Sequence, residues 1–343
     1  MCVNSFGRLF RVTVFGESHG ASVGVNIDGV PAGVPLKQED FLADLERRKG
    51  GARGTTPRKE EDLPFLKSGV FNDHTTGAPI TILFENNNTR STDYEKLREF
   101  PRPGHADFVA TEKFGGFEDY RGGGHFSGRL TLNLVAAGVI AKKILGDDIQ
   151  VKATIKEVGG NPDPEAGLEA AIAAKDSVGG LVECTVDGLP IGLGEPFFDS
   201  LESNLAHAVF AIPAVKGIEF GAGFAAAKMK GLEHNDPIID KTGKTATNHA
   251  GGVVGGITNG NQLVFRIAVK PTSSTPKEQQ TLNIKSGEVE TFSVKGRHDL
   301  CIALRVPVVL EAVTAMVLAD FMLLEQRRPR VVSRKGAEEA KEA

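Results

Sequence analysis

The sequence predicts an α/β fold made of two similar halves, and three observations support that prediction. Segments with the two-residue alternation of strands are interspersed with segments of helical periodicity. The chain has 343 residues, enough for one or two domains. The stretch VNIDGVPAGVP at 25–35 returns as CTVDGLPIGLGEP at 184–196, and a helical segment follows each copy. Asp-Gly and Gly-x-Pro are common in turns, so chance is the alternative, but here the turn and its flanking elements repeat together.

The first half is expected to begin with a hairpin whose strands, 9–14 and 23–28, flank FGESHG at 15–20. A helix follows at 36–49, where apolar residues recur at helical spacing. The next elements are a polar, basic loop at 50–62, a strand at 79–84, a polar loop at 86–92 and a long, mostly apolar helix at 127–145.

The second half is expected to contain strands at 151–157, 181–187, 214–220 and 262–269, with a helical segment, FDSLESNLAHAVF, at 198–210. The longest apolar run, 306–324, is interrupted by Pro307, Glu311 and Asp320. These interruptions predict a buried helix at 307–326 rather than a membrane span. We therefore expect one domain over 1–326 and a charged, flexible tail over 327–343.

Composition excludes several classes of partner. A net charge of −4 provides no global field that would attract nucleic acid or a membrane, so any anion site must be a local cluster of basic residues. The three cysteines are widely spaced, which argues against a disulfide framework or a Cys-x-x-Cys metal site and fits a reducing compartment. No signal-peptide pattern is present at the N-terminus. We expect a cytoplasmic protein without a metal.

Four histidines lie in turns bordered by glycine or arginine. His19 is in FGESHG, His105 in RPGHAD, His125 in RGGGHFSGR and His298 in GRHD. None belongs to a His-x-His or His-Glu-x-x-His metal pattern. A single histidine is more often structural than catalytic, but glycine allows a substrate to approach closely, and imidazole exchanges protons near pH 7.

Arginines accompany the same loops. Arg47, Arg48, Arg53 and Arg58 surround GGARGTTPR, Arg102, Arg121 and Arg129 flank the histidine loops, and Arg297 precedes His298. The plain interpretation is a solvated charged face. It does not explain why the arginines return at each glycine-rich turn, whereas a substrate with several negative charges does, since guanidinium groups bind carboxylates and phosphates.

Three nucleotide-binding patterns are weak. Residues 123–130 have P-loop spacing, but Arg129 and Leu130 stand where Lys and Ser or Thr are required. GAGFAA at 221–226 is a lone match to a dinucleotide fingerprint. AVKPTSS at 268–274 offers lysine and hydroxyls that suit a phosphate, but taken alone it is better interpreted as an ordinary Thr/Ser-rich turn.

Taken together, the motifs resemble those of the chorismate synthase family. FGESHG, RRKGGARGTTPR, SGVFNDHTTGAPI, PRPGHADF, RGGGHFSGRLT, AVKGIEFGAGF, NHAGGVVGGITNG, AVKPTSS and GRHDLC occur in this order between about residues 4 and 325. The resemblance implies an α/β sandwich with internal pseudo-duplication, in which long helices pack between antiparallel sheets. It also implies the 1,4-elimination of phosphate from 5-enolpyruvylshikimate 3-phosphate to give chorismate, in the shikimate pathway of aromatic amino acid biosynthesis, with reduced FMN.

The resemblance also implies residue roles. His19 matches the histidine that protonates the reduced flavin, and His105 matches the one that protonates the departing phosphate. Asp299 matches the aspartate that helps flavin N5 accept the C6 proton. Arg48, Arg53, Arg102 and Arg129 match residues that bind substrate or NADP. The implied FMN contacts are His125, Phe126, Ser127, Pro213, Ala214, Gly255, Lys270, Pro271, Thr272, Ser273, Ser274 and Arg297.

Some residues depart from the usual family pattern. His125 and Phe126 replace a commoner Arg-Ser pair, which removes a permanent charge, and Leu300 replaces a usual proline. The family is usually homotetrameric. Flavin reduction by NADPH and dependence on an external flavin reductase both stay open.

Two other function classes remain as alternatives. A non-catalytic phosphate- or nucleotide-binding module would need only the arginine loops, and the additional histidines and Asp299 argue against it. A flavin or nicotinamide oxidoreductase is disfavoured by the absence of a clean dinucleotide fingerprint.

Overall fold

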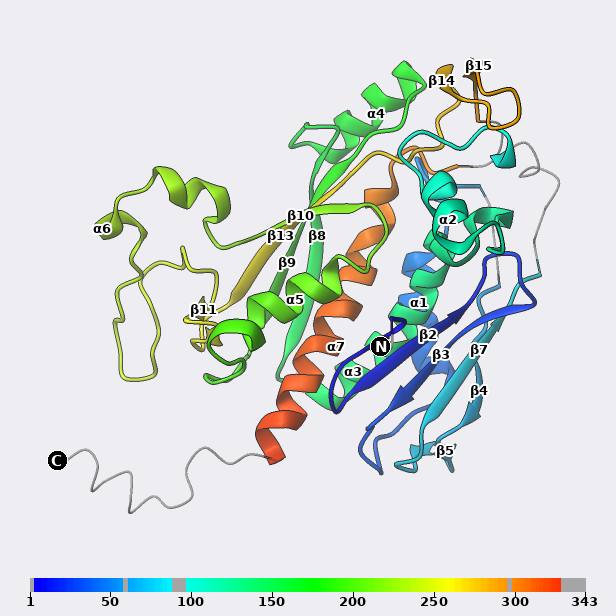
Figure 1. Ribbon diagram of the computed structural model, residues 1–343. Helices are drawn as coiled ribbons and strands as arrows, with labels where there is room; N and C mark the ends of the chain where they lie inside the picture. Colours follow the sequence, from blue (N-terminus) through cyan, green and yellow to red (C-terminus); the bar gives the residue numbers. More distant parts are fainter. Residues whose placement is uncertain (1–2, 58–60, 88–96, 295–297, 328–343) are drawn as a thin grey trace.

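Two antiparallel sheets enclose the central helices in the computed structural model, which describes residues 3–57, 61–87, 97–294 and 298–327 (Figure 1). The first sheet has the order β1-β2-β3-β7-β4 and the second β10-β13-β9-β8. Their strands are β1 (Ser5–Phe6), β2 (Arg11–Gly16), β3 (Ser22–Asp28), β4 (Phe65–Ser68), β7 (Ile80–Glu85), β8 (Gln150–Val158), β9 (Gly180–Asp187), β10 (Val215–Phe220) and β13 (Leu263–Val269). The predicted hairpin, the four predicted strands of the second half and the strand near 79–84 are confirmed.

The layer between the sheets is built on α3 (Thr131–Leu145) and α7 (Val306–Arg327), which pack side by side (Figure 1). Helix α3 contacts β2 and β3, whereas α7 contacts β8 and β9. Both helices are apolar around most of their circumference because each is covered by a sheet on one side and by the other helix on another. The family architecture of helices between antiparallel sheets is therefore confirmed.

Helix α7 carries polar residues within its apolar run, and each is used to join elements. Glu311 accepts hydrogen bonds from Arg47 at 2.7 and 2.8 Å and from the backbone N–H of Ala153 at 3.0 Å. Asp320 accepts the backbone N–H groups of Leu9 and Phe10 at 2.7 and 2.8 Å. The segment Ile302–Gln326 is long and apolar enough to cross a membrane, but 78% of its apolar window is buried inside the protein. The predicted buried helix is confirmed.

The two halves share one topology. In chain order, the first half runs β2, β3, α1 (Leu42–Arg48), β4, β7, α3, and the second runs β8, β9, α5 (Leu201–Val209), β10, β13, α7. In the first sheet β3 pairs with β2 and β7, and the edge strand β4 pairs with β7. In the second sheet β9 pairs in the same way with β8 and β13, and the edge strand β10 pairs with β13. The repeated Asp-Gly-x-Pro-x-Gly pattern therefore marks equivalent strand ends.

Equivalent threonines clamp the two repeated turns. Thr75 Oγ1 donates to the carbonyl of Pro31 at 2.6 Å and accepts the N–H of Val34 at 2.9 Å. In the second half, Thr258 Oγ1 donates to the carbonyl of Pro190 at 2.7 Å and accepts the N–H of Leu193 at 2.9 Å. This matching set of contacts supports duplication over chance as the origin of the repeat.

Several elements were not anticipated from the sequence. They are α2 (Asp107–Phe114), α4 (Pro164–Ala174), α6 (Gly231–His234) and the strands β5 (Val70–Phe71), β6 (His74–Thr75), β11 (Val253–Val254), β12 (Ile257–Thr258), β14 (Gln279–Leu282) and β15 (Val289–Phe292), together with β1 and β4, the two edge strands of the first sheet. The predicted helix at 127–145 begins later, because residues 121–130 form irregular 3₁₀ turns in which three consecutive glycines have non-helical backbone angles.

Candidate active site

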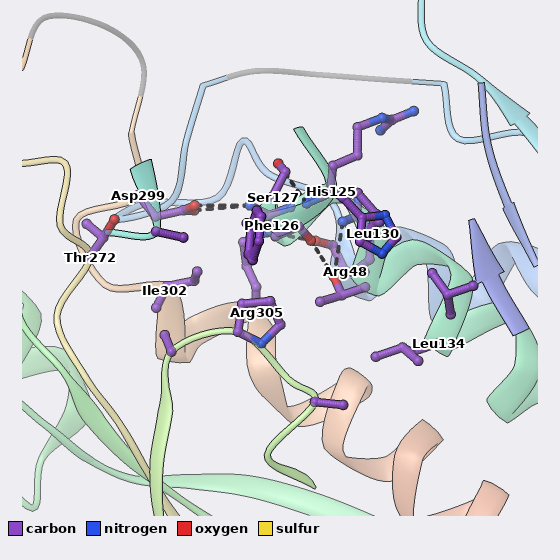
Figure 2. Close-up of a pocket in the computed structure, with 18 of the residues that line it drawn as sticks. Arg48, His125, Phe126, Ser127, Leu130, Leu134, Thr272, Asp299, Ile302 and Arg305 are labelled. Atoms are coloured by element: carbon purple, nitrogen blue, oxygen red, sulfur yellow. Dashed lines mark hydrogen bonds and ion pairs between the residues drawn. The ribbon is translucent and has the colours of Figure 1, made fainter. Parts of the chain in front are cut away.

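A cavity of about 710 Å³ lies at the N-terminal ends of α3 and α7 (Figure 2). Figure 2 shows Thr272, Asp299 and Ile302 along one side of it. Among the described residues, its lining includes six cations, Arg48, Lys49, Arg102, Arg129, Lys270 and Arg305, and two carboxylates, Asp62 and Asp299. The N-termini of helices also favour negative charge. The cavity is therefore suited to a ligand with several negative charges.

Most of the residues expected to contact a flavin line this cavity. They are His125, Phe126, Ser127, Pro213, Ala214, Lys270, Thr272, Ser273 and Ser274, which come from three separate segments. Pro271 and Gly255 are not among the lining residues, and Gly255 lies at the tip of the β11–β12 hairpin. Arg297 lies outside the described residues. The fold thus gathers nine of the twelve expected contacts in one space.

The base of the cavity holds a buried group of three charges. Asp62, whose side chain is 0% exposed, accepts from Arg48 Nη2 at 3.0 Å and from Arg129 Nη1 at 2.9 Å. Burial would raise the pKa of Asp62, but the two guanidinium groups outweigh burial and lower it. Burial, with the repulsion of Arg305 and Arg129, lowers the pKa of Arg48 to about 10, although the attraction of Asp62 raises it. Because this pKa is still well above 7, Arg48 is cationic at neutral pH.

The two arginines of this group differ in their remaining donors. Arg129 also donates Nε to Asn86 Oδ1 at 2.5 Å and Nη2 to the Glu85 carbonyl at 3.2 Å. The buried Nε of Arg48 has no hydrogen-bond partner among the described residues. An unpartnered buried N–H is costly, and an anion in the cavity would satisfy it. Arg48 is therefore the better placed of the two to bind a ligand directly.

Arg53 lies away from this group despite being five residues from Arg48. Its side chain is half exposed and bonds to Glu165 at 2.6 Å and to Glu169 at 2.5 Å, both on α4. It is not among the residues that line the cavity.

His105 lines the cavity and is held by an ion pair. Its Nδ1 lies 2.6 Å from Asp107 Oδ1, while Arg102 donates Nε to Asp107 Oδ2 at 2.7 Å and Nη2 to Oδ1 at 2.8 Å. Burial would raise the pKa of Asp107, but hydrogen bonds from Arg102 and His105 outweigh burial and hold it well below its usual range. Asp107 is therefore ionised throughout the neutral range, and His105 Nδ1–H donates to it.

His19 lies behind the glycine-rich turn and does not line the cavity itself. Its ring packs against Gly122, which has φ +62°, and a Cβ built on Gly122 would lie 2.4 Å from His19 Cδ2. Only glycine combines this backbone angle with so close an approach. Gly122 of the RGGGHFSGR turn thus makes room for the imidazole of His19, a residue that is buried.

Asp299 reaches the cavity from the turn before α7. Its Oδ1 accepts the backbone N–H of Thr56 at 2.9 Å, and Arg305 Nη1 lies 3.3 Å from Oδ1 and 3.1 Å from Oδ2. Arg305 also donates Nε to the carbonyl of Arg48 at 2.8 Å. Arg297, two residues before Asp299, lies outside the described residues. In the described part of the chain Arg305 is the cation beside Asp299, and its bond to the Arg48 carbonyl links Asp299 to Arg48.

Three functional neighbours were not identified from the sequence: Asp62, Asp107 and Arg305. Asp107 follows His105 by two residues in RPGHAD, so its spacing was an available signal. No local pattern marks Asp62, because it meets Arg129 across 67 residues.

The cavity fits a bound FMN on three grounds. The contacts expected for FMN converge on it, its described cations exceed its described carboxylates, and the buried Nε of Arg48 has no acceptor in the described part of the chain. Lys270 donates to Ser273 Oγ at 3.0 Å, and Ser273 donates to the Gly104 carbonyl at 2.8 Å, so the lysine and hydroxyls expected around a phosphate are held together beside His105.

Comparisons with known proteins agree with this site. The family model described as chorismate synthase matches residues 10–323. A chorismate synthase from Chitinophaga pinensis is 88% identical over 96% of this chain and 99% of its own length. One from Dehalococcoides mccartyi is 45% identical, with the same two coverages. A crystal structure of a chorismate synthase superposes with a TM-score of 0.71 at 25% identity and covers 93% of each chain. The chain belongs to the chorismate synthase family.

Proposed function

We propose that this chain binds 5-enolpyruvylshikimate 3-phosphate in the central cavity and converts it to chorismate and phosphate with reduced FMN. Family membership supports this lyase reaction of the shikimate pathway. The observation that supports this cavity as the site is the excess of six cations over two carboxylates among its described lining residues, at two helix N-termini. The substrate carries one phosphate and two carboxylates, which match this environment.

The residues of the cavity divide into those that bind and those that transfer protons. The segments 125–127, 213–214 and 270–274 hold the cofactor, and Arg48 with Arg102 orients the anionic groups of the substrate. When bound, reduced FMN supplies electron density that promotes loss of phosphate without net oxidation or reduction. His105 holds a proton at Nε2 or receives one there, because its Nδ1 is occupied by Asp107. His19 and Asp299 are the further proton-transfer groups.

The direct test is anaerobic turnover of 5-enolpyruvylshikimate 3-phosphate with chemically reduced FMN. Chorismate and phosphate should appear in equal amounts, and neither should appear with oxidised FMN. Absence of chorismate under reducing conditions would refute the proposal. The same assay with oxidised FMN and NADPH distinguishes a chain that reduces its own flavin from one that requires an external flavin reductase.

Replacing Arg48 by alanine should raise the KM for substrate more than it lowers kcat. The guanidinium contributes charge-assisted hydrogen bonds worth about 1.5–3 kcal/mol, which corresponds to a KM increase of about 10- to 100-fold. Steady-state kinetics measures both constants. Arg266→Ala is the control, because Arg266 pairs with Glu183 at 2.8 Å and does not line the cavity. An unchanged KM in Arg48→Ala would remove Arg48 from the substrate site.

We also propose a cytoplasmic homotetramer. Large apolar side chains stand exposed on the second half of the chain, among them Phe197, Phe198, Phe224, Leu232 and Ile238, with Phe198 and Leu232 each 93% exposed. Exposed apolar side chains of this size are typical of association surfaces. Cys184 and Cys301 are free and buried, as suits a reducing compartment. Light scattering should give four times the chain mass, and Phe198→Asp should lower that mass if the surface is an interface.

A further inference from the structure

We propose that Asp107 is a positioning residue that fixes the protonation geometry of His105. The inference rests on the proposed function, because His105 is there assigned to proton transfer. Asp107 is the first residue of α2, and its carboxylate lies under the imidazole, with Oδ1 2.6 Å from His105 Nδ1. A contact this short requires a proton between the two atoms.

The neighbouring arginine decides which atom carries that proton. Arg102 Nη2 lies 3.1 Å from His105 Nδ1 and 2.8 Å from Asp107 Oδ1. Arg102 donates to Oδ1 and keeps Asp107 ionised, and an ionised carboxylate only accepts, so the hydrogen in the 2.6 Å contact with Oδ1 belongs to Nδ1. Nδ1 therefore carries the hydrogen, and in the neutral ring Nε2 is left as the acceptor.

The rest of the loop holds the carboxylate in place. Asp107 Oδ2 accepts both Nε of Arg102 at 2.7 Å and the backbone N–H of Arg102 at 3.0 Å, while His105 N–H donates to the Arg102 carbonyl at 3.1 Å. The side chains of Arg102 and Asp107 are 6% and 13% exposed. Residues 102–107 thus form a closed loop in which the carboxylate is rigid.

The other edge of the His105 ring carries Cε1 and Nε2. A Cβ built on Gly123 would lie 3.5 Å from His105 Cε1 and 3.7 Å from Nε2, so a glycine borders this edge of the ring. Both His105 and Gly104 line the large cavity. An imidazole with Nδ1 fixed by Asp107 therefore presents Nε2 in one orientation and one tautomer, which is the requirement for efficient proton transfer.

The test is Asp107→Asn, which keeps the shape but loses the charge that selects the tautomer. We expect kcat to fall at least about tenfold. In the His105→Ala background, Asp107→Asn should cause no further loss, because the residue acts through His105. Nitrogen-15 NMR of His105 in the ligand-free protein should show one Nδ1-protonated tautomer in wild type and a mixture in Asp107→Asn.

Asp236→Asn is the matched control. Asp236 also accepts backbone N–H groups and lies 3.4 Å from a histidine Nδ1, that of His249, but it does not line the cavity described above. It should keep wild-type kcat. A wild-type kcat in Asp107→Asn, an additive loss with His105→Ala, or an unchanged His105 tautomer would each overturn the inference. The NMR result does not depend on turnover, so it separates failure of this inference from failure of the proposed reaction.

Discussion

Replacing His105 by alanine is expected to lower turnover by about two to four orders of magnitude, the usual contribution of a general acid or base. The imidazole lines the cavity beside Lys270 and Ser273, and Asp107 orients it. Anaerobic single-turnover measurements with reduced FMN should show the loss in the chemical step. The fold should persist because the ring is a loop side chain outside the main hydrophobic core.

The same change at His19 should also lower turnover by about two to four orders of magnitude. His74→Ala is the control for both, since His74 is exposed on β6 and bonds only locally to the carbonyl of Asn72 at 2.8 Å. A near-normal rate across the pH range in either variant would remove that histidine from proton transfer. His19 packs against Gly122, so circular dichroism and thermal unfolding should accompany its kinetics.

Replacing Asp299 by asparagine is expected to leave flavin and substrate binding intact while turnover falls by about two orders of magnitude or more. Asparagine has nearly the same shape, but its amide cannot accept a proton as a carboxylate does. Among the described residues, Oδ1 accepts from both Thr56 N–H and Arg305, whereas Oδ2 accepts from Arg305 alone. Oδ2 therefore keeps a lone pair that can accept a proton. Equilibrium titration and single-turnover rates measure the two effects separately.

The competing role for Asp299 is to hold Arg305 in position. In that case Asp299→Asn would weaken binding while saturated turnover stayed nearly intact, and Arg305→Lys would reproduce the same defect. Asp163→Asn serves as the control. Asp163 caps the N-terminus of α4 by accepting the N–H of Glu165 at 3.1 Å, and asparagine caps equally well.

The elements that the sequence predicts well are those with strong periodicity. The apolar core helix near 307–326 and the longer strands of both sheets are recognisable because one side-chain pattern extends over many residues. The short strands, such as those of β5–β6 and β11–β12, have two residues each, too few for a periodic pattern. Helix α2 has little amphipathic character, and its outward face exposes Phe108, Val109 and Phe114, so no apolar stripe marks it.

The sequence by itself determined the duplication, the family motifs and the histidines and arginines at the glycine-rich turns, because each is a local pattern of neighbouring residues. Only the tertiary structure decided how those residues pair. Arg48 and Arg53 are alike in sequence, yet the end of α1 buries the first against Asp62 and leaves the second at the surface beside α4. Thr56 meets Asp299 across 243 residues, and Arg129 meets Asp62 across 67. Such contacts depend on how two sheets and two helices pack, and no pattern of adjacent residues records that packing.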